Sequence, residues 1–216
     1  MEYNHKSISL AEQIFERLEN DILSGKYPRG ELITELRLSE ELGVSRTPIR
    51  EALHRLSQEH LIEDRPKGSV VLGITRQDVC DIFKIRLKIE GMAAAECAKN
   101  ITDEQLKTLG ETLELQEFYI SRDNVDNIRI MDSRFHEQMY LFSGSTVFYD
   151  TLFPLHRKTQ KYRRTSVANH GNAEVSLLEH TKIFEAIKSH NEAAAEKAAT
   201  KHIENAQKRI LLKEDI

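Results

Sequence analysis

Four polar residues stand at positions where the sequence otherwise predicts apolar helix faces. Asp132 and His136 lie four residues apart in IRIMDSRFHEQMYLF, so both share one helix face with its apolar residues. His180 and His202 occupy similar positions in two later stretches, SLLEHTKIFEAI and AAAEKAATKHIENA. Taken singly, each is typical of a buried polar side chain that is satisfied by hydrogen bonds. Taken together, three imidazoles and a carboxylate from three helices predict a divalent metal site, and Zn²⁺, Ni²⁺ and Mn²⁺ all remain candidates.

Arg86 is a further charged residue on a predicted apolar face. It lies in DVCDIFKIRLKIEGMAAAECA, a stretch whose apolar residues recur at helical spacing. A buried guanidinium needs a partner, because an unpaired buried charge is very costly. Two partners remain open: Glu90, which lies one turn away, or the carboxylate of a small effector molecule that binds beside the metal.

A second group of residues has the chemistry of DNA recognition. The formal net charge of the chain is -4, so contact with nucleic acid must come from a local basic patch. Residues 46–76 carry six Lys or Arg against four Asp or Glu, whereas residues 1–45 carry five against nine. Arginine can donate two hydrogen bonds to guanine or to phosphate, and short hydroxyls can reach phosphates beside a helix N-terminus. The expected DNA contacts are Ser45, Arg46, Thr47, Arg50, Lys67 and Gly68. The competing interpretation is an ordinary solvent-exposed helix end.

Three helices and a hairpin are expected to position these DNA contacts. Helical periodicity covers residues 10–22 and 35–42, and Gly43 suits the end of the second helix because glycine takes positive φ freely. Ser45 then stands at the N-cap position of a third helix. Residues 61–72 predict two short strands around a Pro-Lys-Gly tip. This order is that of a winged helix-turn-helix.

Two domains are expected from a change of pattern near residue 75. Residues 1–75 form the winged helix-turn-helix, and helical periodicity dominates residues 76–216, which predict an all-helical bundle of six or seven helices. The fold class is therefore mainly α. The composition, 39% hydrophobic and 31% charged, is typical of a globular protein. With two cysteines and no leader or long apolar run, a reduced cytoplasmic protein without membrane contact is expected.

The stretch GVSRTPIREAL, residues 43–53, resembles the signature of the GntR family of bacterial transcription regulators. The resemblance extends over about residues 8–74. It implies that Arg46 and Arg50 correspond to DNA-contacting arginines and that Gly68 marks the tip of the wing.

The chain departs from this family pattern at two places. His60 stands where the family usually has glycine, so it must adopt a helix-end conformation normally given to glycine. Many relatives carry Arg-Glu where this chain has Leu36-Arg37. Arg37 is therefore a less secure DNA contact than the arginines of the third helix.

The helical part resembles the FCD domain, the effector domain of the FadR-type branch of that family. The shared pattern is Asp, three residues, His, 43 residues, His, 21 residues and His. The resemblance implies metal ligands at Asp132, His136, His180 and His202. It also implies a small organic acid as effector, with Arg86 as its contact. The histidines interpreted as surface or loop residues are His156, His170 and His190.

We therefore expect a ligand-responsive bacterial transcription regulator that binds a double-stranded DNA operator as a homodimer. It would not be an enzyme. One alternative is a metal-dependent hydrolase or oxygenase built on the Asp/His₃ site, although the sequence offers no well-placed general base. Glu137 follows His136 directly and should point about 100° away from it on the helix. The other alternative is a DNA-binding dimer without metal.

Overall fold

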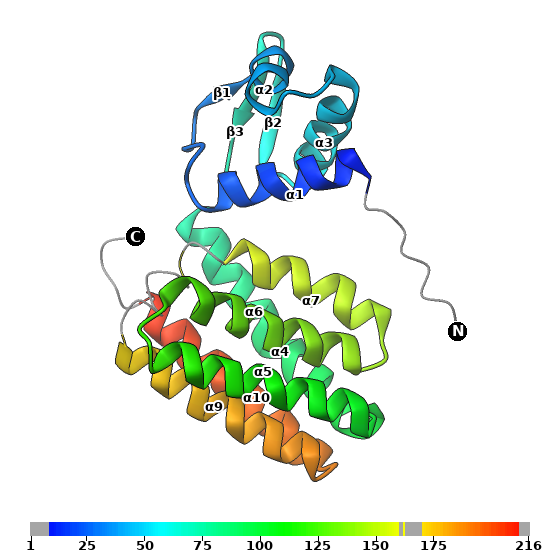
Figure 1. Cartoon of the computed structure of the whole chain (residues 1–216), viewed down its shortest axis with the longest axis vertical. Helices are drawn as coiled ribbons and strands as arrows, with labels where there is room; N and C mark the ends of the chain where they lie inside the picture. The colour runs from blue at the N-terminus through cyan, green and yellow to red at the C-terminus, as the bar shows by residue number, and fades with distance from the viewer. Residues whose placement is uncertain (1–8, 160–161, 163–169, 212–216) are drawn as a thin grey trace. The chain divides into compact units, whose positions relative to one another are not determined.

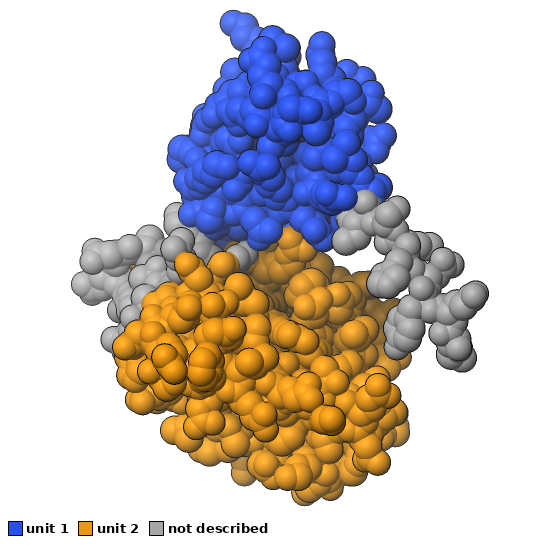
Figure 2. All heavy atoms as spheres, in the orientation of Figure 1, with its two compact units in different colours: residues 1–75 blue, residues 76–216 orange. Residues whose placement is uncertain are grey.

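The computed structural model describes residues 9–159, 162 and 170–211. The chain divides into two compact units, Met1–Thr75 and Arg76–Ile216 (Figure 2). In the described residues, the first unit contains helices and a small sheet, and the second contains helices alone (Figure 1). This architecture confirms the predicted fold class, a winged helix-turn-helix followed by an all-helical bundle.

Three helices form the body of the first unit: α1 (Leu10–Leu23), α2 (Glu35–Leu42) and α3 (Arg46–Gln58). Their apolar faces meet in one core, where Leu18, Leu38 and Ile49 are fully buried. α2 ends at Gly43, whose φ of 66° is left-handed and turns the chain into α3. Gly43 thus makes the turn between the two helices of the predicted helix-turn-helix.

The sheet of the first unit has three strands: β1 (Leu32–Ile33), β2 (Ile62–Arg65) and β3 (Gly68–Val71). They are antiparallel in the order β1-β3-β2. The hairpin of β2 and β3 was predicted, whereas β1 has only two residues and leaves no periodic signal in the sequence. At Gly68 φ is 138°, and a Cβ there would lie 2.6 Å from the carbonyl oxygen of Ile33, so only glycine fits where the wing meets β1.

His60 links α3 to the hairpin in the left-handed conformation that glycine usually adopts at a helix end. Its φ is 57°, in the left-handed region that glycine adopts without cost. The N–H of Leu61 donates to the carbonyl oxygen of Leu56 at 2.9 Å, which closes the end of α3. The expectation that His60 tolerates a glycine-like helix end is confirmed.

The described part of the second unit contains long helices packed side by side (Figure 1): α4 (Arg76–Asn100), α5 (Asp103–Ile120), α6 (Val125–Phe142), α7 (Thr146–Lys158), α9 (His170–Lys188) and α10 (Glu192–Leu211). Side chains cap four of them: Thr102 starts α5 in a capping box with Gln105, Asn124 starts α6, Ser145 starts α7, and Asn191 starts α10. None of the described helices is long and apolar enough to cross a membrane.

Small residues let α4 and α10 approach closely. A Cβ added at Gly91 would clash with Thr200 and with the backbone of Glu196. On the α10 side, Ala195 and Ala199 are buried in the same core. This close packing brings the next turns of α10, which carry His202, against the polar residues of α4.

Candidate metal centre and DNA-reading surface

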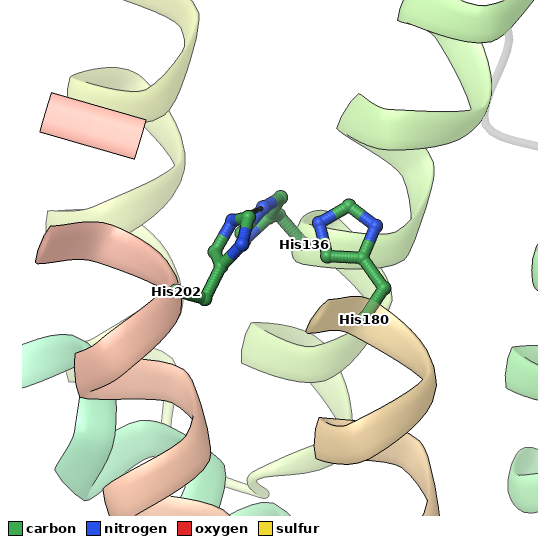
Figure 3. Close-up of side chains that lie close together, drawn as sticks. All are labelled: His136, His180 and His202. Atoms are coloured by element: carbon green, nitrogen blue, oxygen red, sulfur yellow. Dashed lines mark hydrogen bonds between the residues drawn. The ribbon is translucent and has the colours of Figure 1, made fainter. Parts of the chain in front are cut away.

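Three helices bring the four predicted metal ligands into one buried cluster. α6 supplies Asp132 and His136, α9 supplies His180, and α10 supplies His202, and none of these residues is more than 5% exposed. One ring nitrogen from each histidine lies within 4.8 Å of the others, and the three imidazoles face a common point (Figure 3). Asp132 lies beside them, with Oδ1 3.8 Å from Nε2 of His180.

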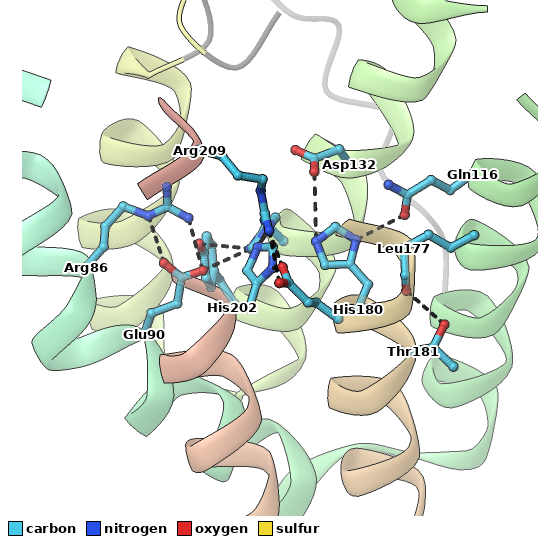
Figure 4. A network of polar contacts seen from close by, with 12 residues as sticks. Arg86, Glu90, Gln116, Asp132, Leu177, His180, Thr181, His202 and Arg209 are labelled. Carbon is cyan, nitrogen blue, oxygen red and sulfur yellow. Dashed lines mark hydrogen bonds and ion pairs between the residues drawn. The ribbon is translucent and has the colours of Figure 1, made fainter. Parts of the chain in front are cut away.

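Each histidine of the cluster is held through its Nδ1 atom by an oxygen from a neighbouring element, as Figure 4 shows for His180 and Gln116. An imidazole that donates its Nδ1 proton presents the lone pair of Nε2 in the opposite direction, and metal-binding histidines in proteins are oriented in this way. The pairs are His136 with Glu90 of α4 at 2.9 Å, His180 with Gln116 of α5 at 3.0 Å, and His202 with Glu179 of α9 at 2.8 Å.

The Nε2 atoms of His136 and His202 make an unusual contact inside the cluster. Nε2 of His136 lies 3.2 Å from Nε2 of His202. If both rings are neutral and donate through Nδ1, two acceptors face each other, which is unfavourable unless a cation lies between them. Within the described residues, Nε2 of His180 has no hydrogen-bond partner. Burial lowers the pKa of His136 and lowers that of His180 strongly, so burial favours the neutral form of these two rings.

Arg86 forms an ion pair with Glu90, one of the two partners that the sequence left open. Its Nε and Nη2 atoms donate to the two carboxylate oxygens of Glu90 at 2.8 and 3.1 Å, and both side chains are almost fully buried. Burial opposes ionisation of both groups, yet the charge of Arg86 and the hydrogen bond from His136 keep the pKa of Glu90 well below its usual range. Arg86 is thus connected to the histidine cluster by Glu90, which contacts both Arg86 and His136.

Glu179 has a comparable place on the other side of the cluster. Besides His202, it accepts from Nη1 and Nη2 of Arg209 at 3.0 and 2.8 Å and from Asn205 at 2.7 Å. Burial raises the pKa of this carboxyl, but the hydrogen bonds from His202 and Arg209 outweigh burial and lower the pKa to about 2. A carboxylate therefore stands behind two of the three histidines at neutral pH.

A cavity opens beside the cluster and contains two guanidinium groups. Arg86 and Arg209 line it together with Asp132, His136 and His202. The rest of the wall mixes polar and apolar side chains, namely Phe83, His156, Asn172, Ser176, Ala206 and Ile210. The two guanidinium groups favour a negatively charged guest, but the cavity volume is about 30 Å³, room for about one or two water molecules, so a larger anion needs the walls to move apart.

His156 was interpreted from the sequence as a surface or loop residue, and this was wrong. It lies in the last turn of α7, is fully buried, lines the cavity, and has its ring centroid 4.5 Å from that of His136. A signal existed, since His156 is four residues after the buried Leu152, but the basic Arg157 and Lys158 that follow suggested an exposed helix end.

The other two histidines lie outside the cluster, as expected. His170 is exposed at the start of α9 and contacts Asp123 at 2.8 Å. His190 lies in the turn after α9, and its Nδ1 lies 2.7 Å from the carbonyl oxygen of Ala98. The acceptors Glu90, Gln116 and Glu179, by contrast, were not identified as site residues from the sequence.

The predicted DNA contacts lie at the exposed start of α3 and on the hairpin. Ser45 is the N-cap of α3, but its hydroxyl makes no capping hydrogen bond, and it is exposed together with Thr47. The side chains of Arg46 and Arg50 are 59% and 66% exposed, and both contact the carboxylate of Glu35 at the start of α2. These residues form one exposed polar surface at the N-terminal end of α3.

A groove runs between this end of α3 and the wing. Lys67 is exposed at the hairpin tip, and Gly68 follows it at the point of close approach to β1. Both line the groove together with Arg46, Arg50 and Arg65. We refer to this set, with Ser45 and Thr47, as the DNA-reading surface, after the role that the sequence predicts for it.

Arg37 is bound elsewhere within the first unit. It donates to Glu31 at 2.6 Å and to Glu41 at 2.7 Å, and its guanidinium lies over the ring of Tyr27. These contacts hold Arg37 against α2 and the chain that precedes it, and its weaker standing as a DNA contact stays a prediction.

Comparison with known proteins identifies both units. Residues 10–72 match the family described as bacterial regulatory proteins, gntR family, and residues 81–205 match the FCD domain. The uncharacterized HTH-type transcriptional regulator YdhC of Bacillus subtilis (strain 168) is 31% identical over 192 residues, which are 88% of this chain and 86% of YdhC. The HTH-type transcriptional repressor RspR of Escherichia coli (strain K12) is 30% identical over 200 residues, 92% of this chain and 88% of RspR.

The gluconate operon transcriptional repressor of Bacillus licheniformis is 34% identical over 116 residues, which are 54% of this chain and 48% of that repressor. Among solved structures, E. coli McbR/YncC is 20% identical and shares the fold, with a TM-score of 0.83 over 96% of this chain and 100% of that one. Regulators of this kind are not enzymes, which removes the hydrolase or oxygenase alternative. The chain belongs to the gntR family of bacterial regulatory proteins, carries an FCD domain, and is a DNA-binding transcription regulator.

Proposed function

We propose that this regulator acts in the cytoplasm as a homodimer and changes its hold on operator DNA when a small carboxylate binds beside a divalent metal ion. The DNA-reading surface contacts the operator. The metal ligands are Asp132, His136, His180 and His202. The observation that carries the metal is the pair of Nε2 atoms 3.2 Å apart in a buried site, each on a ring whose Nδ1 faces a glutamate.

The donor set suits a transition ion. Three imidazole nitrogens and one carboxylate oxygen are ligands that Zn²⁺, Ni²⁺ and Mn²⁺ accept. The two glutamates behind the histidines fix the orientation of the rings and make them better donors to a cation, although each glutamate is itself neutralised by an arginine. When bound, the ion would join α6, α9 and α10 and offer a coordination position to one carboxylate oxygen of the effector.

The effector is a small organic acid held in the cavity beside the cluster. Arg86 gives Nε and Nη2 to Glu90 and also interacts with Tyr140, so it would offer the effector its remaining N–H groups and its positive charge. Arg209 adds a second guanidinium to the same wall. The name of one relative, a gluconate operon repressor, supports this class of ligand, because gluconate is a carboxylate.

Metal analysis of the purified full chain tests this function. Wild type is compared with His136→Ala, His180→Ala and His202→Ala, and with His190→Ala as a matched control outside the cluster. We expect about one ion per chain in wild type and in the control, and a large loss in the other three. A chelator should lower the melting temperature of wild type, because an ion that binds only the folded state stabilises it by mass action.

The alternative of a DNA-binding dimer without metal predicts a different result. Wild type and all variants would then contain equally little metal, and a chelator would not change the melting temperature. That outcome would remove the metal and the proposed anchoring of a carboxylate at Arg86, while leaving the DNA-binding function in place.

A further inference from the structure

Glu35 sits in the middle of the DNA-reading surface, where a carboxylate is not expected. It is the first residue of α2, and its side chain is 24% exposed. Its Oε1 accepts from Nε of Arg50 at 2.8 Å, and its Oε2 accepts from Nη2 of Arg50 at 2.9 Å and from Nη2 of Arg46 at 2.9 Å. One carboxylate therefore holds both arginines that face the DNA.

The contact leaves each guanidinium with donors to spare. Arg50 uses Nε and one N–H of Nη2 toward Glu35, as does Arg46, so the N–H groups of Nη1 and the second N–H of Nη2 remain available on each. The two planes are held in place relative to α2 and α3. The hydrogen bond from Arg50, followed by that from Arg46, keeps the pKa of Glu35 below its ordinary value, so the carboxylate stays charged at neutral pH.

The negative charge of Glu35 acts differently on the two kinds of DNA contact. Phosphates repel a carboxylate, and Glu35 competes with them for the arginine donors. Guanine edges are neutral, and they are read through two well-oriented donors. A group that orients the arginines while repelling phosphates therefore favours base contacts over sequence-independent backbone contacts.

We propose that Glu35 is a specificity-determining residue, which sets how far Arg46 and Arg50 discriminate operator from other DNA. This inference rests on the proposed function, because it requires that both arginines face DNA. An ordinary structural ion pair is the alternative. Ion pairs this exposed contribute little to folding stability, so a structural role would not change DNA selectivity.

The test compares Glu35→Gln with Glu40→Gln in the full-length protein. Glu40 is an exposed residue of the same helix, and its substitution changes the net charge equally. A duplex selected by wild type from random sequence serves as operator, and a scrambled duplex of equal length serves as non-specific DNA. Affinities for both are measured at several salt concentrations, with the melting temperature of each variant as a check on folding.

We expect Glu35→Gln to bind scrambled DNA more tightly and to lose about tenfold or more of the operator-to-scrambled affinity ratio. The salt dependence of its scrambled-DNA binding should steepen by about one to two phosphate contacts, one for each released arginine. Glu40→Gln should keep the wild-type ratio. Glu35→Ala, which leaves no amide to replace the carboxylate, should change the ratio in the same direction as Glu35→Gln.

Three outcomes would overturn the inference. The first is an unchanged ratio in both Glu35 variants while Arg50→Ala still weakens operator binding, which leaves the proposed function intact. The second is an equal loss in Glu40→Gln, which assigns the effect to net charge. The third is unchanged operator affinity in both Arg46→Ala and Arg50→Ala, which refutes α3 as the reader and the inference together.

Discussion

Two arginine–glutamate contacts in this chain show how burial changes what the same chemistry does. Arg86 and Glu90 are about 1% exposed, so each would be an unpaired buried charge without the other. Arg50 and Glu35 meet at similar distance but in contact with water, where the pair adds little folding stability. The buried pair is therefore needed to keep both charges paired inside the fold, whereas the exposed pair can orient Arg50 and leave its remaining donors open to DNA.

Cys97 gives a prediction at the same scale. It is fully buried in α4, and burial raises the pKa of its thiol to about 12. The thiolate is the reactive form, and at pH 8 this pKa leaves almost none of it. We expect a thiol reagent at pH 8 to modify one cysteine, Cys80, in the folded protein and two cysteines in denaturant.

The control for this measurement is Cys80→Ser, which should show no fast reaction while folded. The reaction of Cys97 should become faster as the pH approaches 12 or as denaturant unfolds α4. Two equally fast equivalents in native wild type at pH 8 would contradict the burial of Cys97.

At the scale of elements, the sequence predicts much of the fold because apolar periodicity is a local property. It indicated the helix-turn-helix, the hairpin and the helical second unit, and the His60 departure indicated a glycine-like turn. It also brought Asp132 and His136 onto one face. Such properties depend on residues only a few positions apart.

The partners of the histidines could not be predicted in the same way. Glu90 and Glu179 are acidic residues on helices that carry many others, and only the packing of α4 and α9 selects them. His156 differs, because its spacing from the buried Leu152 was a local signal that the neighbouring Arg157 and Lys158 outweighed. The glutamate partners follow from register between helices, which no short stretch of sequence contains.

Glu90 carries the prediction for α4. Because it holds Nδ1 of His136 and is itself held by Arg86, Glu90→Gln should weaken metal binding by about 10- to 100-fold, as loss of an orienting partner usually does. The matched control is Asp81→Asn, an exposed acid of the same helix. Metal affinity is measured by competition with a chromogenic chelator.

If Glu90→Gln and Asp81→Asn bind metal as wild type does, Glu90 serves only to neutralise Arg86. A double variant, Arg86→Met with Glu90→Gln, separates that role. It should regain part of the folding stability lost on removing one partner of a buried pair, while metal binding stays weak.

At the scale of the whole molecule, one chain combines a DNA-binding unit with an FCD domain. A single winged helix-turn-helix presents one recognition helix, and its few contacts would bind a short site weakly. Association of two chains doubles the contacts and fixes their spacing. The symmetry of a dimer should then appear in the DNA.

We therefore expect the full chain to sediment as a dimer and to protect a palindromic or near-palindromic site, whose half-site spacing is set by the dimer. Analytical ultracentrifugation and footprinting measure the two properties independently. Arg50→Ala is the control, because it should lose operator affinity and remain dimeric. A monomer that protects an asymmetric site would refute the dimer. A dimer on an asymmetric site would show instead that only one recognition helix reads bases, so the second could serve for backbone contact alone.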